Sequence, residues 1–169
     1  MTDAVMANGT TPDDAATAPA APVAGKPPAR VSVTWAGDHR FDAGRPGGPS
    51  IRLDASGATG PSPVDGLIAS LGACISVDVV DILAKRRTPV SALRIDVAGA
   101  RANAVPARIT AVQLDVHVDG DGIERVHAER AVELAVTKYC SVRDSLRTDI
   151  DVRWTVVING AAPDDMATG

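Results

Sequence analysis

The stretch LGACISVDVVDIL, residues 71–83, is apolar around nearly the whole circumference of a helix, yet it contains a thiol and two carboxylates. The helix begins upstream, where Ser62 suits the N-cap, Pro63 the first helical position and Asp65 the third. Because Pro89 cannot continue it, the pattern predicts one helix that runs to about Arg87. At 3.6 residues per turn, one broad face of this helix carries Leu67, Leu71, Cys74, Ile75, Asp78 and Ile82.

Three polar side chains have both a structural and a functional interpretation, namely Cys74, Cys140 and Asp65. Cys74 is either an inert core thiol or a reactive group. Asp78 lies one helical turn away, and its negative charge would raise the pKa of the Cys74 thiol. A reactive Cys74 therefore requires a nearby cation, such as an arginine from elsewhere in the chain. Cys140 precedes a second helix start at Ser141, which favours a thiolate, or it packs in the core. Asp65 is either a helix cap or a functional carboxylate.

The composition excludes several classes of protein. The chain has 169 residues, which fits one domain, and its 45% apolar residues can build a core. A net charge of −4 argues against nucleic acid as a partner. The acidic N-terminus is unlike a secretory signal, and the aspartates within residues 66–84 argue against a membrane span, so we expect a cytoplasmic protein. The three histidines have no ligand spacing, so we expect no metal site.

The remaining patterns predict an α+β domain over residues 29–160 in the order β-β-β-α-β-β-α-α-β. Residues 1–28 are rich in Ala, Pro and Thr and predict a disordered tail, and residues 161–169 predict a flexible C-terminal tail. A second long helix is expected over 123–138 and a short one from Ser141. Strands are expected at residues 30–36, 39–43, 50–54, 91–102, 107–120 and 149–159.

Two motifs resemble the OsmC/Ohr family. They are G-P-S-P-V-D-G-L-I-A-S-L-G-A-C (60–74), continued by I-S-V-D-V-V-D-I-L, and K-Y-C-S-V-x-x-S-L (138–146). The OsmC-like branch of that family typically shows S-P-x-E-L-L-x-x-L-x-x-C-x-x-x-D-V and a second cysteine in K-Y-C-S-V. The similarity extends over roughly residues 30 to 160, from the tryptophan and glycine of Trp35-Ala36-Gly37 to the last strand. The better match is to the OsmC-like branch, and two cysteine motifs in the right order on the right elements make the resemblance to the family specific.

The resemblance implies a fold and an activity. The fold is an intertwined homodimer in which antiparallel sheets wrap a long central helix. The activity is a thiol-dependent peroxidase for organic hydroperoxides, and also for H₂O₂, that needs no metal and no bound cofactor. Cys74 would be the peroxidatic cysteine and Cys140 the resolving one. An external dithiol, of which lipoyl-like dithiols are one option, would reduce the resulting disulfide.

The resemblance also implies an activating carboxylate and an activating arginine. The glutamate of the OsmC-like branch lies nine positions before the first cysteine, where this chain has Asp65, and the Ohr-type position holds Val64. The arginine is either Arg52, near the OsmC-type position, or Arg40, near the Ohr-type position; otherwise both are solvated strand residues. Two other functions stay open: a non-catalytic dimeric stress or ligand-binding protein, and a thiol enzyme that acts on another electrophile.

Overall fold

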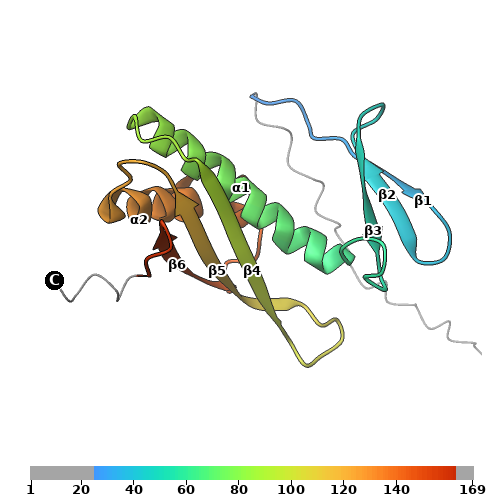
Figure 1. Ribbon diagram of the computed structural model, residues 1–169. Helices are drawn as coiled ribbons and strands as arrows, with labels where there is room; N and C mark the ends of the chain where they lie inside the picture. The colour runs from blue at the N-terminus through green and yellow to red at the C-terminus, as the bar shows by residue number, and fades with distance from the viewer. Residues whose placement is uncertain (1–24, 163–169) are drawn as a thin grey trace, which may run out of the picture. The chain divides into compact units, whose positions relative to one another are not determined.

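The computed structural model describes residues 25–162, and the chain divides after Arg30. Most of both predicted tails therefore lies outside the described residues. Residues 25–30 are exposed and form neither helix nor strand. From Val31 onward the chain forms one compact unit of two three-stranded sheets, a long helix and shorter helices (Figure 1). This confirms the predicted α+β class and the predicted order of the elements.

The first sheet is an antiparallel meander of β1 (Ser32–Trp35), β2 (Arg40–Gly44) and β3 (Ser50–Asp54). The turn between β1 and β2 has positive φ at Gly37 and Asp38, as expected for this predicted hairpin junction. Directly opposed residues share a face, so Val33, Ala43 and Ile51 form one apolar row, and Trp35, Phe41 and Leu53 form the next. Among these residues Val33, Trp35 and Ile51 are more than half exposed, at 63%, 68% and 60%.

Helix α1 (Pro63–Lys85) begins at the predicted N-cap, Ser62. It ends two residues earlier than predicted, because Arg87 adopts a positive φ of 65° before Pro89. The buried face is also rotated from the predicted one: Leu67 is 44% exposed and Cys74 is half-buried. The buried stripe consists of Leu71, Gly72, Ile75, Val79 and Leu83.

A second, apolar stripe of α1 is exposed, at Ala73, Val77, Val80 and Ala84. Within the described residues, only α1 has the length and mean hydropathy (2.0) of a membrane-crossing helix. Its fully buried Leu71, Ile75 and Val79 belong to the core cluster of the domain, which is the pattern of a core helix.

The second sheet consists of β4 (Ala92–Arg101), β5 (Ile109–Asp119) and β6 (Asp151–Ile158), in that order. Strands β4 and β5 are antiparallel, as predicted, but β5 and β6 are parallel, so the prediction of purely antiparallel sheets is wrong. The reason is the connection: the chain crosses from β5 to β6 through the helices that follow β5, which returns it in the same direction. The inner face packs against α1 and supplies Val112, Leu114, Val116, Val118, Val156 and Ile158.

The predicted helix over 123–138 is two elements. Helix α2 (Arg125–Leu134) packs against α1 and continues into the π-helical turn η1 (Ala135–Tyr139). Helix α3 (Ser141–Asp144) follows at the predicted position. In this wider turn the backbone N–H of Cys140 donates to the carbonyl of Ala135, five residues back, at 3.0 Å. In Figure 1, α2 lies beside α1 over the second sheet.

Candidate active site

The two cysteines come from distant elements and lie next to each other. Cys74 is half-buried on α1, while Cys140, between η1 and α3, is only 3% exposed. They meet because α1 packs against both η1 and α3. Burial and the adjacent Cys74 thiol raise the pKa of Cys140 to about 11. The structure therefore brings together the two thiols that the sequence selected, both as free cysteines.

Cys140 is held by its backbone and by its sulfur. It adopts an extended conformation as the N-cap of α3, and its Sγ accepts a hydrogen bond from the backbone N–H of Arg143 at 3.3 Å. This N–H and that of Val142 partly offset the burial that raises the pKa of Cys140. The π-turn and the cap together fix the sulfur toward α1, which sequence periodicity alone does not predict.

A recess of about 620 Å³ opens beside Cys140. Arg143 contributes to one wall, where its guanidinium donates to the carbonyl oxygen of Ile150 at 3.1 Å. The sequence analysis missed this arginine and Trp154, which also lines the recess. Its apolar lining residues are Val136, Leu146, Ile150, Val152 and Trp154, and its polar ones include Lys138, Asp144, Thr148, Asp149 and Asp151.

Asp65 forms the capping box of α1. Its carboxylate accepts the backbone N–H of Ser62 at 3.0 Å, and the Ser62 hydroxyl accepts the backbone N–H of Asp65 at 3.2 Å. These contacts, with Arg101 nearby, hold the pKa of Asp65 below its usual value. The helix-cap interpretation is confirmed, and both donors of the box are used within the helix terminus.

Each candidate arginine has a carboxylate partner in or beside the first sheet. Arg52 forms a bidentate ion pair with Asp42, directly opposite on β2, with Nη2 and Oδ2 3.0 Å apart. This pair lowers the pKa of Asp42 and raises that of Arg52. Arg40 pairs with Asp38 at 2.9 Å. Within residues 25–162 of one chain, neither arginine forms a hydrogen bond or ion pair with a cysteine or with Asp65.

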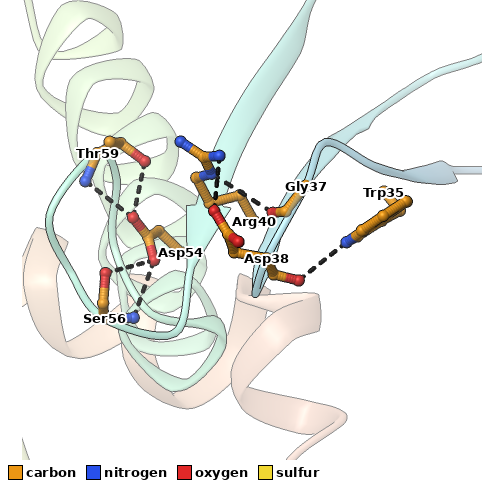
Figure 2. A network of polar contacts seen from close by, with 7 residues as sticks. All are labelled: Trp35, Gly37, Asp38, Arg40, Asp54, Ser56 and Thr59. Atoms are coloured by element: carbon orange, nitrogen blue, oxygen red, sulfur yellow. Dashed lines mark hydrogen bonds and ion pairs between the residues drawn. The ribbon is translucent and has the colours of Figure 1, made fainter.

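A buried carboxylate that the sequence analysis missed organises the loop before α1. Asp54 is 2% exposed and accepts four hydrogen bonds, from the backbone N–H and hydroxyl groups of Ser56 and Thr59, at 2.7–3.0 Å. These donors hold the pKa of Asp54 far below its usual value. Figure 2 shows the loop folded around this carboxylate, with Arg40 and Asp38 paired nearby. The signal was available in D-A-S-G-A-T, because an aspartate two residues before a serine is typical of an Asx-turn.

Asp78, four residues after Cys74, is half-buried and lines a recess of about 460 Å³ between α1 and α2. Three cationic residues share this recess, namely Lys85, Arg86 and Arg130. Cationic side chains and the half-buried Asp78 therefore line the same recess. No cluster of three or more His, Cys, Asp or Glu residues suited to a metal occurs among the residues that the structure describes.

Comparisons with known proteins identify the family of this chain. The profile described as "OsmC-like protein" matches residues 55–155. Protein YhfA of Escherichia coli strain K12 is 31% identical over 124 residues, which cover 73% of this chain and 92% of YhfA. A hypothetical protein from Aquifex aeolicus VF5 has a similar crystal structure, with a TM-score of 0.65 at 27% identity, covering 76% of this chain and 96% of that one.

The likeness in fold extends further. The organic hydroperoxide resistance protein OhrB of Bacillus subtilis has a TM-score of 0.53 at 16% identity, covering 76% of this chain and 96% of OhrB, which shows a shared fold. The family profile spans more than half of the chain, and it includes the two cysteines that meet between α1 and η1. On these grounds the chain belongs to the OsmC-like protein family and has its α+β fold of two small sheets and a long helix.

Proposed function

We propose that this protein is a cysteine-based peroxidase that reduces organic hydroperoxides, and H₂O₂ more slowly, with an external dithiol. The observation that carries the proposal is the meeting of Cys74 and Cys140 from elements far apart in the sequence. A peroxidase of this kind needs one thiol to attack the peroxide and a second within reach of the product. We place it in the cytoplasm, where reducing conditions return both cysteines to thiols.

The reaction divides between the two cysteines. The Cys74 thiolate attacks one peroxide oxygen, the O–O bond breaks, and the alkoxide leaves as an alcohol after it takes up a proton. Cys74 is then a sulfenic acid, which the Cys140 thiol attacks; the S–OH bond breaks, a disulfide forms and water leaves. Burial raises the pKa of Cys140 and leaves this residue only 3% exposed, so its thiol should react with peroxide more slowly than an ordinary exposed thiol.

We further propose that the active unit is a homodimer. The first sheet exposes Val33, Trp35 and Ile51 on one face, and α1 exposes Val77 and Val80. Exposed apolar surfaces of this kind mark interaction sites, and nearby segments of one chain leave these uncovered. A second copy would cover them and would bring its own first sheet, with an arginine, toward the thiols. Arg52 suits this role because its bidentate partner Asp42 already orients the guanidinium.

A second candidate function is a non-catalytic, ligand-binding member of the same fold. This alternative is favoured because the groups expected to activate Cys74 have other partners. Asp65 is used by the helix cap, and Arg40 and Arg52 are both paired with aspartates. Under this alternative the cysteines would be core thiols. The two candidates differ in whether peroxide is consumed at a rate that depends on Cys74.

The deciding experiment measures consumption of cumene hydroperoxide and of H₂O₂ with dithiothreitol as the reductant. The wild type should turn over both, and the organic peroxide faster, whereas Cys74→Ser should show only the background rate of dithiothreitol. Cys140→Ser should accumulate a sulfenic acid at Cys74 that dimedone traps. Equal background rates for the wild type and Cys74→Ser would reject the peroxidase and leave the ligand-binding function.

A further inference from the structure

Two glycines of the motif G-P-S-P-V-D-G (60–66) lie against neighbouring residues of β3, the strand that carries Arg52. A Cβ atom on Gly60 would be 2.4 Å from the carbonyl oxygen of Arg52 and 3.1 Å from its Cγ. Because Gly60 has no positive φ, glycine is needed here for the close approach and not for the backbone conformation. A Cβ atom on Gly66 would instead be 3.0 Å from Cδ2 of Leu53, which points to the opposite face of the sheet from Arg52. Gly60 therefore sets how closely its loop approaches the arginine, and Gly66 does not.

The loop that carries Gly60 is closed by the buried carboxylate of Asp54 (Figure 2). Asp54 Oδ1 accepts the backbone N–H and the hydroxyl of Ser56 at 2.9 and 2.7 Å, and Oδ2 accepts those of Thr59 at 3.0 and 2.7 Å. The backbone N–H of Asp54 also donates to the carbonyl oxygen of Pro61 at 3.0 Å. Contacts on both sides of Gly60 therefore hold this loop against β3, and the burial of Asp54 strengthens them.

The guanidinium of Arg52 is held along one edge and open along another. Its Nε and Nη2 donate to the two carboxylate oxygens of Asp42, which lies directly opposite on β2. Within residues 25–162 the Arg52 side chain forms no other hydrogen bond, although a guanidinium has five N–H donors. The side chain is 35% exposed, so the two N–H groups of Nη1 are available to an anionic group that reaches this face.

These contacts restrain Arg52 at two points. Asp42 holds the guanidinium, and the backbone of Gly60 limits the movement of Cγ and of the main chain. An arginine side chain has several rotatable bonds and loses their freedom when its guanidinium binds a partner. Restraint at both ends lowers that cost and fixes the direction in which the open edge of the guanidinium points.

We propose that Gly60 is a positioning residue for peroxide reduction: with the loop bound by Asp54 it fixes the stem of Arg52, so that Asp42 presents the Nη1 edge of this arginine to the reacting thiolate and peroxide. The inference rests on the proposed function, which gives Arg52 its role. It adds to that function the loop that orients the arginine and the edge of the guanidinium that is used. Thr59 acts in the same way, through Asp54 and the loop.

The first test measures the position of Arg52 without any peroxide. NMR titration of the Asp42 carboxyl gives its pKa, which the ion pair with Arg52 holds below the ordinary value. Arg52→Ala should raise this pKa, and Gly60→Ala should raise it part of the way, because the new methyl group pushes the Arg52 backbone away from the loop. Gly66→Ala should leave it unchanged, since its methyl group meets only the flexible end of Leu53. A wild-type pKa of Asp42 in Gly60→Ala would overturn the inference.

The second test is a double-mutant cycle in the full-length protein. Gly60→Ala should lower kcat/KM for cumene hydroperoxide about tenfold, because a small displacement of an oriented group removes much of its effect. In the Arg52→Ala background Gly60→Ala should cause no further loss, since it acts only through this arginine. Gly66→Ala should keep the wild-type rate. The same tenfold loss from Gly60→Ala in both backgrounds would mean a merely structural role and would refute the positioning of Arg52.

A milder variant keeps the inference testable should Gly60→Ala not fold. Thr59→Val removes one hydroxyl that donates to Asp54 and leaves Gly60 in place. The loosened loop should raise the pKa of Asp42 and lower kcat/KM about threefold, the usual size of effect for one hydrogen bond. Thr110→Val removes a hydroxyl that donates to a carbonyl on β4 and should do neither. Identical behaviour of the two threonine variants would count against the loop as the positioning element.

Failure of the inference and failure of the proposed function give different results. If Arg52→Ala left peroxide consumption unchanged while Gly60→Ala still raised the pKa of Asp42, the proposed function would lose its arginine, and the hold of Gly60 on Arg52 would stand. If Arg52→Ala slowed peroxide consumption while Gly60→Ala changed neither the rate nor the pKa of Asp42, the proposed function would stand and the positioning role of Gly60 would be refuted.

Discussion

The thiol of Cys140 lies beside that of Cys74, at the contact between η1 and α1, and burial with this proximity raises the pKa of Cys140 from 9.0 to about 11. The pair differs in exposure: Cys74 is half-buried, and Cys140 is buried. Under the proposed function this asymmetry separates the tasks of two chemically identical groups, because access and protonation, as well as residue type, govern the reactivity of a cysteine.

Alkylation of Cys140 should therefore have an unusual pH dependence. Its rate with iodoacetamide should rise tenfold per pH unit and level off only near pH 11. At pH 8 the thiolate fraction of Cys140, and with it this rate, should be about a hundredfold lower than for a thiol with the ordinary pKa. Mass spectrometry of peptide 139–143 measures this rate, with urea-unfolded protein as the control. The pKa of Cys140 is higher in the folded than in the unfolded protein. The contribution of Cys140 to the free energy of unfolding is therefore complete below pH 9.0 and is lost as the pH rises toward 11. A plateau near pH 9 in the folded protein would contradict the burial argument.

The two candidate arginines can be separated by matched substitutions. Arg52→Ala should lower kcat/KM for cumene hydroperoxide about a hundredfold, the usual effect of removing one charged donor from a reacting centre. Arg40→Ala removes the same charge from the neighbouring strand and should leave the rate within about threefold. Steady-state peroxide consumption measures both. The reverse ranking would assign the role to Arg40, and two near-wild-type variants would favour the ligand-binding function.

Substitutions in the capping box of α1 should change stability and not peroxidase activity. Ser62→Ala should lower the free energy of unfolding by about 1 kcal/mol, since it leaves a helix N–H without its acceptor. Asp65→Ala should also destabilise, and the double variant should lose less than the sum, because the two side chains form one motif. Urea unfolding at pH 7 measures these effects. If Asp65→Ala instead abolished peroxidase activity without changing stability, the carboxylate would be a functional group and not a cap.

Asp54 should make stability sensitive to acid. Four hydrogen bonds lower the pKa of Asp54 in the folded protein. Its contribution to the free energy of unfolding is therefore present above the pKa of an unfolded aspartate, about 4, and is lost as the pH falls below that value. Asp54→Asn should lower stability at pH 7 and flatten its decline between pH 5 and pH 2. Urea midpoints across that range provide the measurement, with exposed Asp121→Asn as the control. An unchanged acid slope in Asp54→Asn would mean that the loop is held by other contacts.

The proposed dimer predicts a difference between two equally exposed valines. Val77 on α1 is 62% exposed and Val126 on α2 is 61% exposed. Val77→Glu should dissociate the dimer, since an unpaired carboxylate in an apolar interface is strongly unfavourable, whereas Val126→Glu should not. Sedimentation velocity at micromolar concentration distinguishes them. A folded monomeric wild type would remove the dimer from the mechanism.

Much of the fold could be predicted from local patterns. The strand at residues 50–54 and the N-cap at Ser62 were predicted at their observed positions, because alternation and capping chemistry are local. The parallel pairing of β5 with β6 was not, because strand direction depends on the route of the connecting helices. The π-turn at Ala135–Tyr139 was also missed, since it has nearly the same apolar pattern as an α-helix.

The sequence by itself determined the long apolar helix and its N-cap, because periodicity and N-cap chemistry are local properties of the chain. Only the tertiary structure decided that Cys140 is buried beside Cys74 and that Arg52 faces Asp42. Exposure and charge pairing depend on residues that are remote in the sequence, and packing of α1 against η1 and the second sheet brings those residues together.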